Sequence, residues 1–320
     1  FERLADIVDT PEESTDIDKK KIPLPPISGA VAFENVQFRF NQGGPSVLKN
    51  INLTIPAGTF VGVVGQSGSG KSTLMKLISR LYSPEDGRIL IDGFDIDKVE
   101  LYSLRRQIGI VPQEVNLDAF FSPKKLLELQ AGLYGIREKD RITNLILKLV
   151  ALEDKANAYS RSLSGGMKRR LLIAKAMVHQ PPILILDEPT AGVDVELRNN
   201  LWDNVKKLNK EGVTIILTTH YLIEAQEMCD RIAIINKGDL VALDTTEKLL
   251  DRIKTKKIKL KVKNIELNKN LVMKGINFEI KSEKSILLTY EKNSLDFGEI
   301  VNYLNTNNVK IEDILTEDGD

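Results

Sequence analysis

The chain is short of cysteine and of long apolar runs, and each shortage excludes a class of protein. Its one cysteine, Cys229, excludes an internal disulfide and any zinc site built from several cysteines, which fits a reducing cytosol. No uninterrupted apolar stretch approaches the ~20 residues that a helix needs to cross a bilayer. The chain opens on Phe1-Glu2-Arg3, without methionine and without a basic and then apolar leader. We therefore expect a piece of a longer or processed chain that carries no signal peptide.

The chain also lacks an excess of charge of either sign. The 45 basic and 45 acidic residues give a formal net charge of zero, so overall charge does not predict binding to nucleic acid or to anionic lipid. Hydrophobic residues make up 42% of the chain and charged residues 28%, which is typical of a globular protein with a substantial core. A length of 320 residues indicates one large domain, or a large domain with a small one.

Short apolar runs alternate with helical patterns along most of the chain. The pattern predicts strands at residues 31–38, 47–55, 59–65, 183–186, 213–218 and 231–235, and a closing hairpin at 234–243. It predicts helices at residues 71–81, 195–211 and 222–229, and a mainly helical segment at 118–160. Continuous apolar strands separated by helices predict a parallel sheet that is buried on both faces.

The two ends of the chain differ from this pattern. Residues 1–29 are charged and then proline-rich, and they are interpreted as a linker. Composition changes again near residue 251, and residues 251–320 are predicted to form a small α+β appendage. Lysines alternate with apolar residues at 257–263, which predicts a strand with one lysine face. A solvated face or the protection of a sheet edge is the favoured interpretation, and a face that contacts lipid or a partner is the alternative.

A glycine-rich loop after the strand at 59–65 carries the first chemical signal. It matches the phosphate-binding pattern G-x-x-x-x-G-K-[ST], followed by Thr73, with the residues Gly65, Gln66, Ser67, Gly68, Ser69, Gly70, Lys71 and Ser72. Glycines let backbone N–H groups turn toward phosphate oxygens, Lys71 is expected to reach the β- and γ-phosphates, and the Ser72 hydroxyl is expected to ligate Mg²⁺. The helix that begins at Lys71 directs the positive end of its dipole at the same anion.

An apolar strand that ends in two acids carries the second signal. Residues 183–186 run directly into Asp187 and Glu188. On its own this pattern fits a strand that enters a solvated acidic turn. Beside a phosphate loop it predicts that Asp187 holds Mg²⁺ through water and that Glu188 polarises the attacking water.

The third signal is Leu163-Ser164-Gly165-Gly166-Met167, which precedes a basic helical segment at 168–171. A serine and two glycines at a helix start form an anion site. Together with the phosphate loop, this element resembles the signature motif of the ATP-binding cassette (ABC) family, although Met167 stands where the family usually has glutamine. The resemblance implies that Ser164, Gly165 and Gly166 contact the ATP held by a partner subunit.

The resemblance extends to further positions and implies a role for each. Gln113 matches the glutamine loop that senses Mg²⁺ and the attacking water, and His220 matches the histidine that contacts the γ-phosphate. Asp194 matches the loop that crosses the dimer interface, and Phe40 matches the aromatic residue that stacks on adenine, where tyrosine is commoner. His179 matches no such element and is predicted to be structural.

The family also implies an architecture and partners. We expect an α/β fold at residues 30–250, with a P-loop NTPase core of mostly parallel strands, an antiparallel β-subdomain and a helical subdomain at about 115–175. ATP and Mg²⁺ are the expected cofactors. The expected partners are a second copy in a head-to-tail dimer and a transmembrane permease, with no nucleic acid. Hydrolysis would power transport, in the direction of export, at the cytoplasmic face of the cell membrane.

The resemblance is not uniform. Residues 1–114 resemble bacterial peptide or bacteriocin exporters, in which membrane helices and ATPase share a chain, so that residues 1–29 would follow an absent membrane domain. From Val115 onward the chain resembles ATP-binding subunits of drug, polysaccharide or lipid exporters, whose permease is separate. A fused and a separate permease both stay open.

Two alternatives to a transport ATPase are less favoured by the sequence. A soluble ABC-type ATPase that acts on ribosomes or DNA usually has two cassettes or long coiled coils, together with basic surfaces. A catalytically inactive nucleotide-binding module is disfavoured by the presence of Glu188 and His220.

Overall fold

The computed structural model describes residues 20–190, 195–252, 255–263, 265–266, 271–291 and 297–317. Their contacts divide the chain into two compact units, residues 1–246 and 247–320. The end of the expected linker that the structure describes is bound to the larger unit. Leu24 is buried, its N–H donates to Ser103 Oγ at 2.8 Å, and the Ile27 N–H donates to Gln107 Oε1 at 2.9 Å. In the described residues no helix is both long and apolar enough to span a membrane.

An antiparallel sheet forms one layer of the larger unit, with strand order β2-β1-β4-β5. Its strands are β1 (Val31–Phe38), β2 (Leu48–Ile55), β4 (Asp86–Ile91) and β5 (Phe94–Asp95). Side chains alternate between buried and exposed along β2, as expected of a sheet with one face toward water. The strands predicted at 31–38 and 47–55 are confirmed.

A second, mostly parallel sheet has the order β10-β9-β3-β8-β7-β6, in which only β10 runs antiparallel to its neighbour. Its strands are β3 (Phe60–Val64), β6 (Ile108–Val111), β7 (Ile183–Asp187), β8 (Thr214–Thr219), β9 (Arg231–Asn236) and β10 (Asp239–Thr245). All residues of β3, β7 and β8 are buried. The predicted parallel sheet with two covered faces and its closing hairpin are confirmed.

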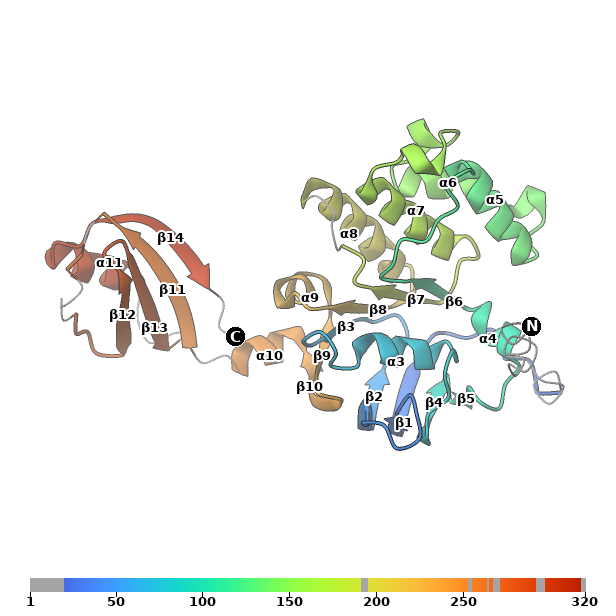
Figure 1. Cartoon of the computed structure of the whole chain (residues 1–320), viewed down its shortest axis with the longest axis horizontal. Coiled ribbons are helices and arrows are strands. Elements are labelled where there is room, and N and C mark those ends of the chain that lie inside the picture. The colour runs from blue at the N-terminus through green and yellow to red at the C-terminus, as the bar shows by residue number, and fades with distance from the viewer. Residues whose placement is uncertain are drawn as a thin grey trace, which may run out of the picture. The chain divides into compact units, whose positions relative to one another are not determined.

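Helix α3 (Lys71–Ile78) lies between the two sheets (Figure 1). Leu74 and Leu77 of this helix pack in one cluster with side chains from both sheets, such as Phe33 and Val63. Burying a side chain of this size contributes about 1.5–3 kcal/mol, so this layer fixes the position of the helix. The predicted helix ends earlier than residue 81, because the chain turns at Arg80, whose φ is 51°.

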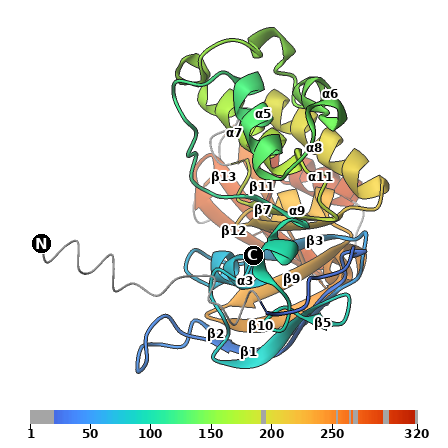
Figure 2. The ribbon, with the colours of Figure 1, turned by 90° about the vertical axis from the view of Figure 1, so that its right-hand side faces the viewer.

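A helical subdomain lies on the other side of the parallel sheet (Figure 2). Three helices share one apolar cluster that includes Leu127, Leu147 and Leu171. They are α5 (Pro123–Leu133), α6 (Thr143–Leu149) and α7 (Gly165–Met177). In the described part of the larger unit, further α-helices are α4 (Leu101–Arg105), α8 (Val195–Lys210) and α9 (Leu222–Met228).

The smaller unit is an antiparallel sheet of order β12-β13-β11-β14 with one helix in its apolar cluster. Its elements are α10 (Thr246–Arg252, which begins in the larger unit), β11 (Thr255–Val262), β12 (Ile276–Ser282), β13 (Ser285–Glu291), α11 (Phe297–Thr306) and β14 (Ile311–Glu317). Ile258, Leu260 and Val262 of β11 are buried, and the lysines between them lie on the opposite, at least partly exposed face. The edge-protection interpretation of these lysines is wrong, because β11 pairs with β13 on one side and β14 on the other.

Candidate active site

A cavity of about 680 Å³ opens at the carboxyl ends of the parallel strands. Residues that follow β3, β6, β7 and β8 meet there, as is usual for ligand sites of α/β sheets. The lining consists of Phe40, Val47, Gly65, Gln66, Ser67, Gly68, Gly70, Lys71, Ser72, Thr73, Gln113, Glu188 and His220. All of them except Val47 are residues that the sequence predicts for the site. Val47 is an apolar residue directly before β2, which gives no sequence signal for binding.

The phosphate loop connects β3 to α3 and needs glycine at two positions for different reasons. At Gly65 a Cβ atom would lie 2.1 Å from the Ile235 carbonyl oxygen. Gly70 caps α3 with a φ of 107°, and a Cβ there would lie 2.7 Å from Leu48 Cδ2. A side chain at either position would therefore displace the loop.

Polar groups of this loop are directed inward. The Lys71 ammonium is buried and donates to the carbonyl oxygens of Gly65 at 2.8 Å and Gln66 at 3.0 Å. Burial lowers the pKa of Lys71, whereas the carboxylates of Glu188 and Asp187 act in the opposite direction. The Ser69 hydroxyl is buried without a hydrogen-bond partner among the described residues. A lysine, an orphaned hydroxyl and the free N–H groups of a helix start form a set that suits phosphate.

Beside the loop, oxygen ligands gather around Asp187 at the end of β7. The Ser72 hydroxyl donates to Asp187 Oδ1 at 3.1 Å, and the Thr218 hydroxyl donates to the same oxygen. The described residues hold no cluster of three or more histidine, cysteine or acidic side chains that would bind a metal alone. Mg²⁺ in nucleotide sites uses one or two carboxylates together with phosphates and water, and a hydroxyl next to a carboxylate fits that need. Thr218, which holds the carboxylate in place, was not predicted.

Three predicted catalytic side chains converge on one point. Glu188 Oε2 accepts a hydrogen bond from Gln113 Nε2 at 3.0 Å, and Glu188 Oε1 lies 3.3 Å from His220 Nδ1. Glu188 has a φ of 46°, a left-handed conformation that costs a non-glycine residue of the order of 1–3 kcal/mol. Such strain concentrates at functional sites, because only the surrounding structure can maintain it.

At the other end of the cavity, aromatic rings form a small group. Phe40 is 51% exposed, and its ring makes edge contacts with Phe38 at 5.0 Å and with Tyr82 at 5.5 Å between centroids. A half-exposed ring that is supported from behind can stack on a planar base. Tyr82 was not predicted, since it lies far from Phe40 in the sequence.

The predicted signature residues lie elsewhere in the chain's own fold. Ser164 caps α7 and accepts a hydrogen bond from the Met167 N–H at 3.3 Å. Ser164 and Gly165 are exposed, and neither they nor Gly166 line the cavity. Asp194 lies outside the described residues.

His179 does not line the cavity. His179 Nε2 lies 3.3 Å from the Ile108 carbonyl oxygen, and its ring stacks on Tyr134 at 3.9 Å, which agrees with the predicted structural role.

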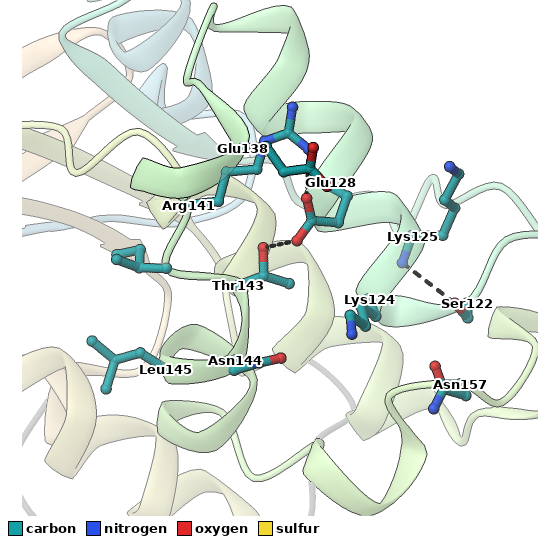
Figure 3. A pocket seen from close by; sticks show the side chains of 11 residues that line it. Ser122, Lys124, Lys125, Glu128, Glu138, Arg141, Thr143, Asn144, Leu145 and Asn157 are labelled. Carbon is teal, nitrogen blue, oxygen red and sulfur yellow. Dashed lines mark hydrogen bonds and ion pairs between the residues drawn. The ribbon is translucent and has the colours of Figure 1, made fainter.

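A second hollow, of about 800 Å³, lies on the helical subdomain, between the start of α5 and the start of α6 (Figure 3). Its carboxylate Glu128 already accepts hydrogen bonds from Arg141 and Thr143. Burial would raise the pKa of Glu128, but these hydrogen bonds outweigh it and lower the pKa. We therefore assign the chemistry to the smaller cavity.

Known proteins resemble this chain in sequence and in fold. A family model described as ABC transporter matches residues 48–191. The chain is 36% identical over 222 residues to the linearmycin resistance ATP-binding protein LnrL of Bacillus subtilis (strain 168), and this match covers 69% of the chain and 70% of that protein. The chain belongs to the ABC transporter family. As a member, it is an α/β nucleotide-binding domain that hydrolyses ATP.

Two further ABC proteins illustrate how the family uses such a domain. The leukotoxin translocation ATP-binding protein LktB of Pasteurella haemolytica-like sp. (strain 5943B) is 36% identical over 255 residues, which cover 78% of this chain and 35% of LktB. The chain thus spans about a third of that relative. A solved structure described as the dimeric post-hydrolysis state of an ATP-binding cassette bound to ADP and Pi has a TM-score of 0.61 and 30% sequence identity, and it covers 68% of this chain and 98% of that one. These relatives do not favour the alternative of an ATPase acting on ribosomes or DNA.

Proposed function

We propose that this domain drives an exporter by hydrolysing Mg²⁺-bound ATP in the 680 Å³ cavity. The observation that carries the proposal is the convergence of Gln113, Glu188 and His220 beside the buried ammonium of Lys71. Lys71, the loop from Gly65 to Thr73 and the start of α3 bind the phosphates, and Phe40 stacks on the adenine ring.

Glu188 acts as the general base in this proposal. Its carboxylate accepts the proton of a water molecule that attacks the γ-phosphate, a step that general-base help typically accelerates 10²–10⁴-fold. Gln113 orients that water through its contact with Glu188 at 3.0 Å. His220 lies on the other oxygen of the carboxylate and contacts the γ-phosphate.

Ser72, Asp187 and Gln113 would hold the metal ion. When bound with ATP, Mg²⁺ would neutralise charge on the phosphate oxygens. Thr218 keeps the Asp187 carboxylate directed toward Ser72 by its own hydrogen bond.

A second copy completes the site. The exposed Ser164 and Gly165, with the half-buried Gly166, contact ATP held by the other copy of a head-to-tail C2 dimer. We assign Asp194, which lies outside the described residues, to the dimer interface. Two observations support this arrangement: the signature residues do not line their own cavity, and a similar ATP-binding cassette has a dimeric structure.

Export is the transport direction that we propose, with a permease as partner at the cytoplasmic face of the membrane and no nucleic acid. Support comes from the relatives, which are named for linearmycin resistance and leukotoxin translocation. In this proposal residues 30–250 form the ATPase domain, residues 1–29 link it to a membrane domain, and residues 251–320 are an appendage. The permease of such a mosaic chain is either fused, as residues 1–114 suggest, or separate, as residues from 115 onward suggest.

Phosphate release by the 320-residue chain with Mg²⁺-ATP tests the proposal. Glu188→Gln keeps the size of the side chain but cannot accept a proton, so we expect turnover to fall about 10²-fold or more while ATP binding persists. Glu227→Gln, which changes another glutamate outside the cavity, serves as the control. A Glu188→Gln protein with half the wild-type rate would place the general base elsewhere.

A further inference from the structure

Arg169 is a buried charged residue of helix α7, with only 2% of its surface exposed. Its guanidinium donates to four backbone carbonyl oxygens. Nε donates to Pro189 at 2.9 Å, Nη1 donates to Pro112 at 2.9 Å and to Gln113 at 2.7 Å, and Nη2 donates to Glu188. Burial lowers the pKa of Arg169, and the carboxylates of Asp187 and Glu188 oppose that shift.

These carbonyls belong to two separate segments that carry catalytic side chains. Pro112 and Gln113 follow β6, whereas Glu188 and Pro189 follow β7. The donors of a guanidinium lie in one plane at fixed angles, so carbonyls bound to the same guanidinium cannot move independently. One side chain therefore sets the separation of the two segments whose side chains meet at 3.0 Å between Gln113 Nε2 and Glu188 Oε2.

The strained backbone of Glu188 is held from both sides. Its N–H donates to the Thr218 carbonyl oxygen at 3.1 Å and approaches Thr218 Oγ1 at 3.2 Å. Its carbonyl oxygen accepts from Arg169. A left-handed conformation at a glutamate persists only where neighbours over-determine it, and Arg169 supplies the constraint on the carbonyl side.

The next residue provides a natural comparison. Arg170 is also buried, with 5% exposure, and also donates to backbone carbonyls, those of Val150 at 2.7 Å and Ala151 at 2.8 Å. Both of these acceptors lie at the end of α6 in the helical subdomain. Arg170 thus ties α7 to its own subdomain, and Arg169 ties the same helix to the catalytic segments.

We propose that Arg169 is a positioning residue for ATP hydrolysis, which holds Glu188 and Gln113 at their working separation and couples both to helix α7. The proposal rests on the roles assigned to Glu188 and Gln113 in the proposed function. Because Ser164 caps the start of α7, a displacement of that helix would connect Ser164 to both catalytic segments through one side chain.

The test compares Arg169→Gln and Arg169→Lys with the matched variants Arg170→Gln and Arg170→Lys. For each chain we would measure kcat and KM for ATP, the affinity for a fluorescent ATP analogue, and Tm. A misplacement of about 1 Å can cost on the order of 10²-fold in rate, so Arg169→Gln should lose about 10²-fold in kcat and change ATP affinity less than about threefold. Arg169→Lys, which keeps the charge and some donors, should recover part of that kcat. Arg170→Gln should lower Tm at least as much and keep kcat within about twofold.

Several outcomes would overturn the assignment. They are an Arg169→Gln kcat within twofold of wild type, an equal loss of kcat in Arg169 and Arg170 variants of matched Tm, or a failure of both Arg169 variants to fold, which would make the residue purely structural. Glu188→Gln is measured in the same assays. If that variant keeps its turnover, the proposed role of Glu188 fails, whereas the contrast between Arg169 and Arg170 reports on positioning alone.

Discussion

Two helices of this domain begin with a glycine-rich segment, and their surroundings differ. Helix α3, capped by Gly70, starts in a cavity that Lys71 and Glu188 line, and its Ser72 hydroxyl donates to Asp187. Helix α7 starts at Ser164 in an exposed position, with its serine bonded to the backbone of its own first turn. Both starts offer unpaired N–H groups and a positive dipole end. Such a start makes a complete phosphate site only where the tertiary structure adds charged groups. In the proposed function, the start of α7 meets those groups on another chain.

The largest effect is expected at the complete site. Lys71→Ala removes the cation of the phosphate loop, and charged hydrogen bonds contribute about 1.5–3 kcal/mol each. We therefore expect ATP affinity to fall roughly 10²-fold or more, measured by titration with a fluorescent ATP analogue. Lys76→Ala, an exposed lysine on the same helix, should bind as wild type does. Wild-type affinity in Lys71→Ala would contradict the assignment of the cavity.

A change at the start of α7 should, unlike Lys71→Ala, lower turnover without weakening ATP binding. Ser164→Arg should leave ATP binding nearly intact, because Ser164 does not line the cavity. Turnover should fall by about 10²-fold, the scale of losing preorganised donors at a transition state.

Light scattering would check the dimer in the same experiment. The Glu188→Gln protein loaded with ATP should dimerise. The double variant Glu188→Gln, Ser164→Arg should stay monomeric under the same conditions. Ser122→Arg removes the corresponding cap of α5 and controls for lost helix stability, since an N-cap contributes about 0.5–2 kcal/mol. Turnover that stays constant on dilution to monomers would eliminate the composite site.

A smaller effect is expected at the aromatic end of the cavity. Stacking of a base on an aromatic ring contributes about 1–3 kcal/mol, and Phe40 is half exposed. We expect Phe40→Ala to weaken ATP binding about tenfold and to leave the affinity for tripolyphosphate unchanged. Phe94→Ala, which changes another exposed phenylalanine, in strand β5, is the matched control. An equal loss for both ligands would mean that Phe40 supports the phosphate loop instead of the base.

The smallest effect on ATP binding and turnover is expected at the other end of α7, where a change should alter stability alone. Burial lowers the pKa of His179 to about 4, below its value in an unfolded chain. The unfolded state therefore binds a proton at a higher pH than the folded state does, and stability is lost as the pH falls from about 7 toward 4. Between pH 8 and pH 5 this loss is of the order of 2 kcal/mol.

Urea unfolding at several pH values would measure the difference. His179→Gln should show a weaker loss of stability on acidification than wild type, with unchanged ATP affinity at pH 7.5. A His179→Gln protein with the wild-type pH dependence would show that another group titrates.

Local sequence patterns alone predict the phosphate loop, the acids after β7 and the buried strands of this protein. The glycines at 65 and 70, the lysine and serine that follow, and the acids at the end of β7 depend on short-range geometry, so a motif of a few residues could predict them. Strands such as β3 and β7 are continuous apolar runs, and their pattern predicts burial directly. Strand β14 was not predicted, since its apolar and polar residues do not alternate and it pairs with β11, which is distant in sequence. Strand β12 was not predicted either, although its apolar and polar residues alternate strictly.

Only the tertiary structure decided which polar residues act together. The sequence around Arg169 and Arg170 does not distinguish their roles, because each guanidinium donates to backbone carbonyls on segments that are remote along the chain. The same holds for Thr218 on Asp187 and for Tyr82 beside Phe40. A hydrogen bond needs partners within about 3 Å, and distances between remote segments are set by the packing of sheets and helices, which no local pattern records.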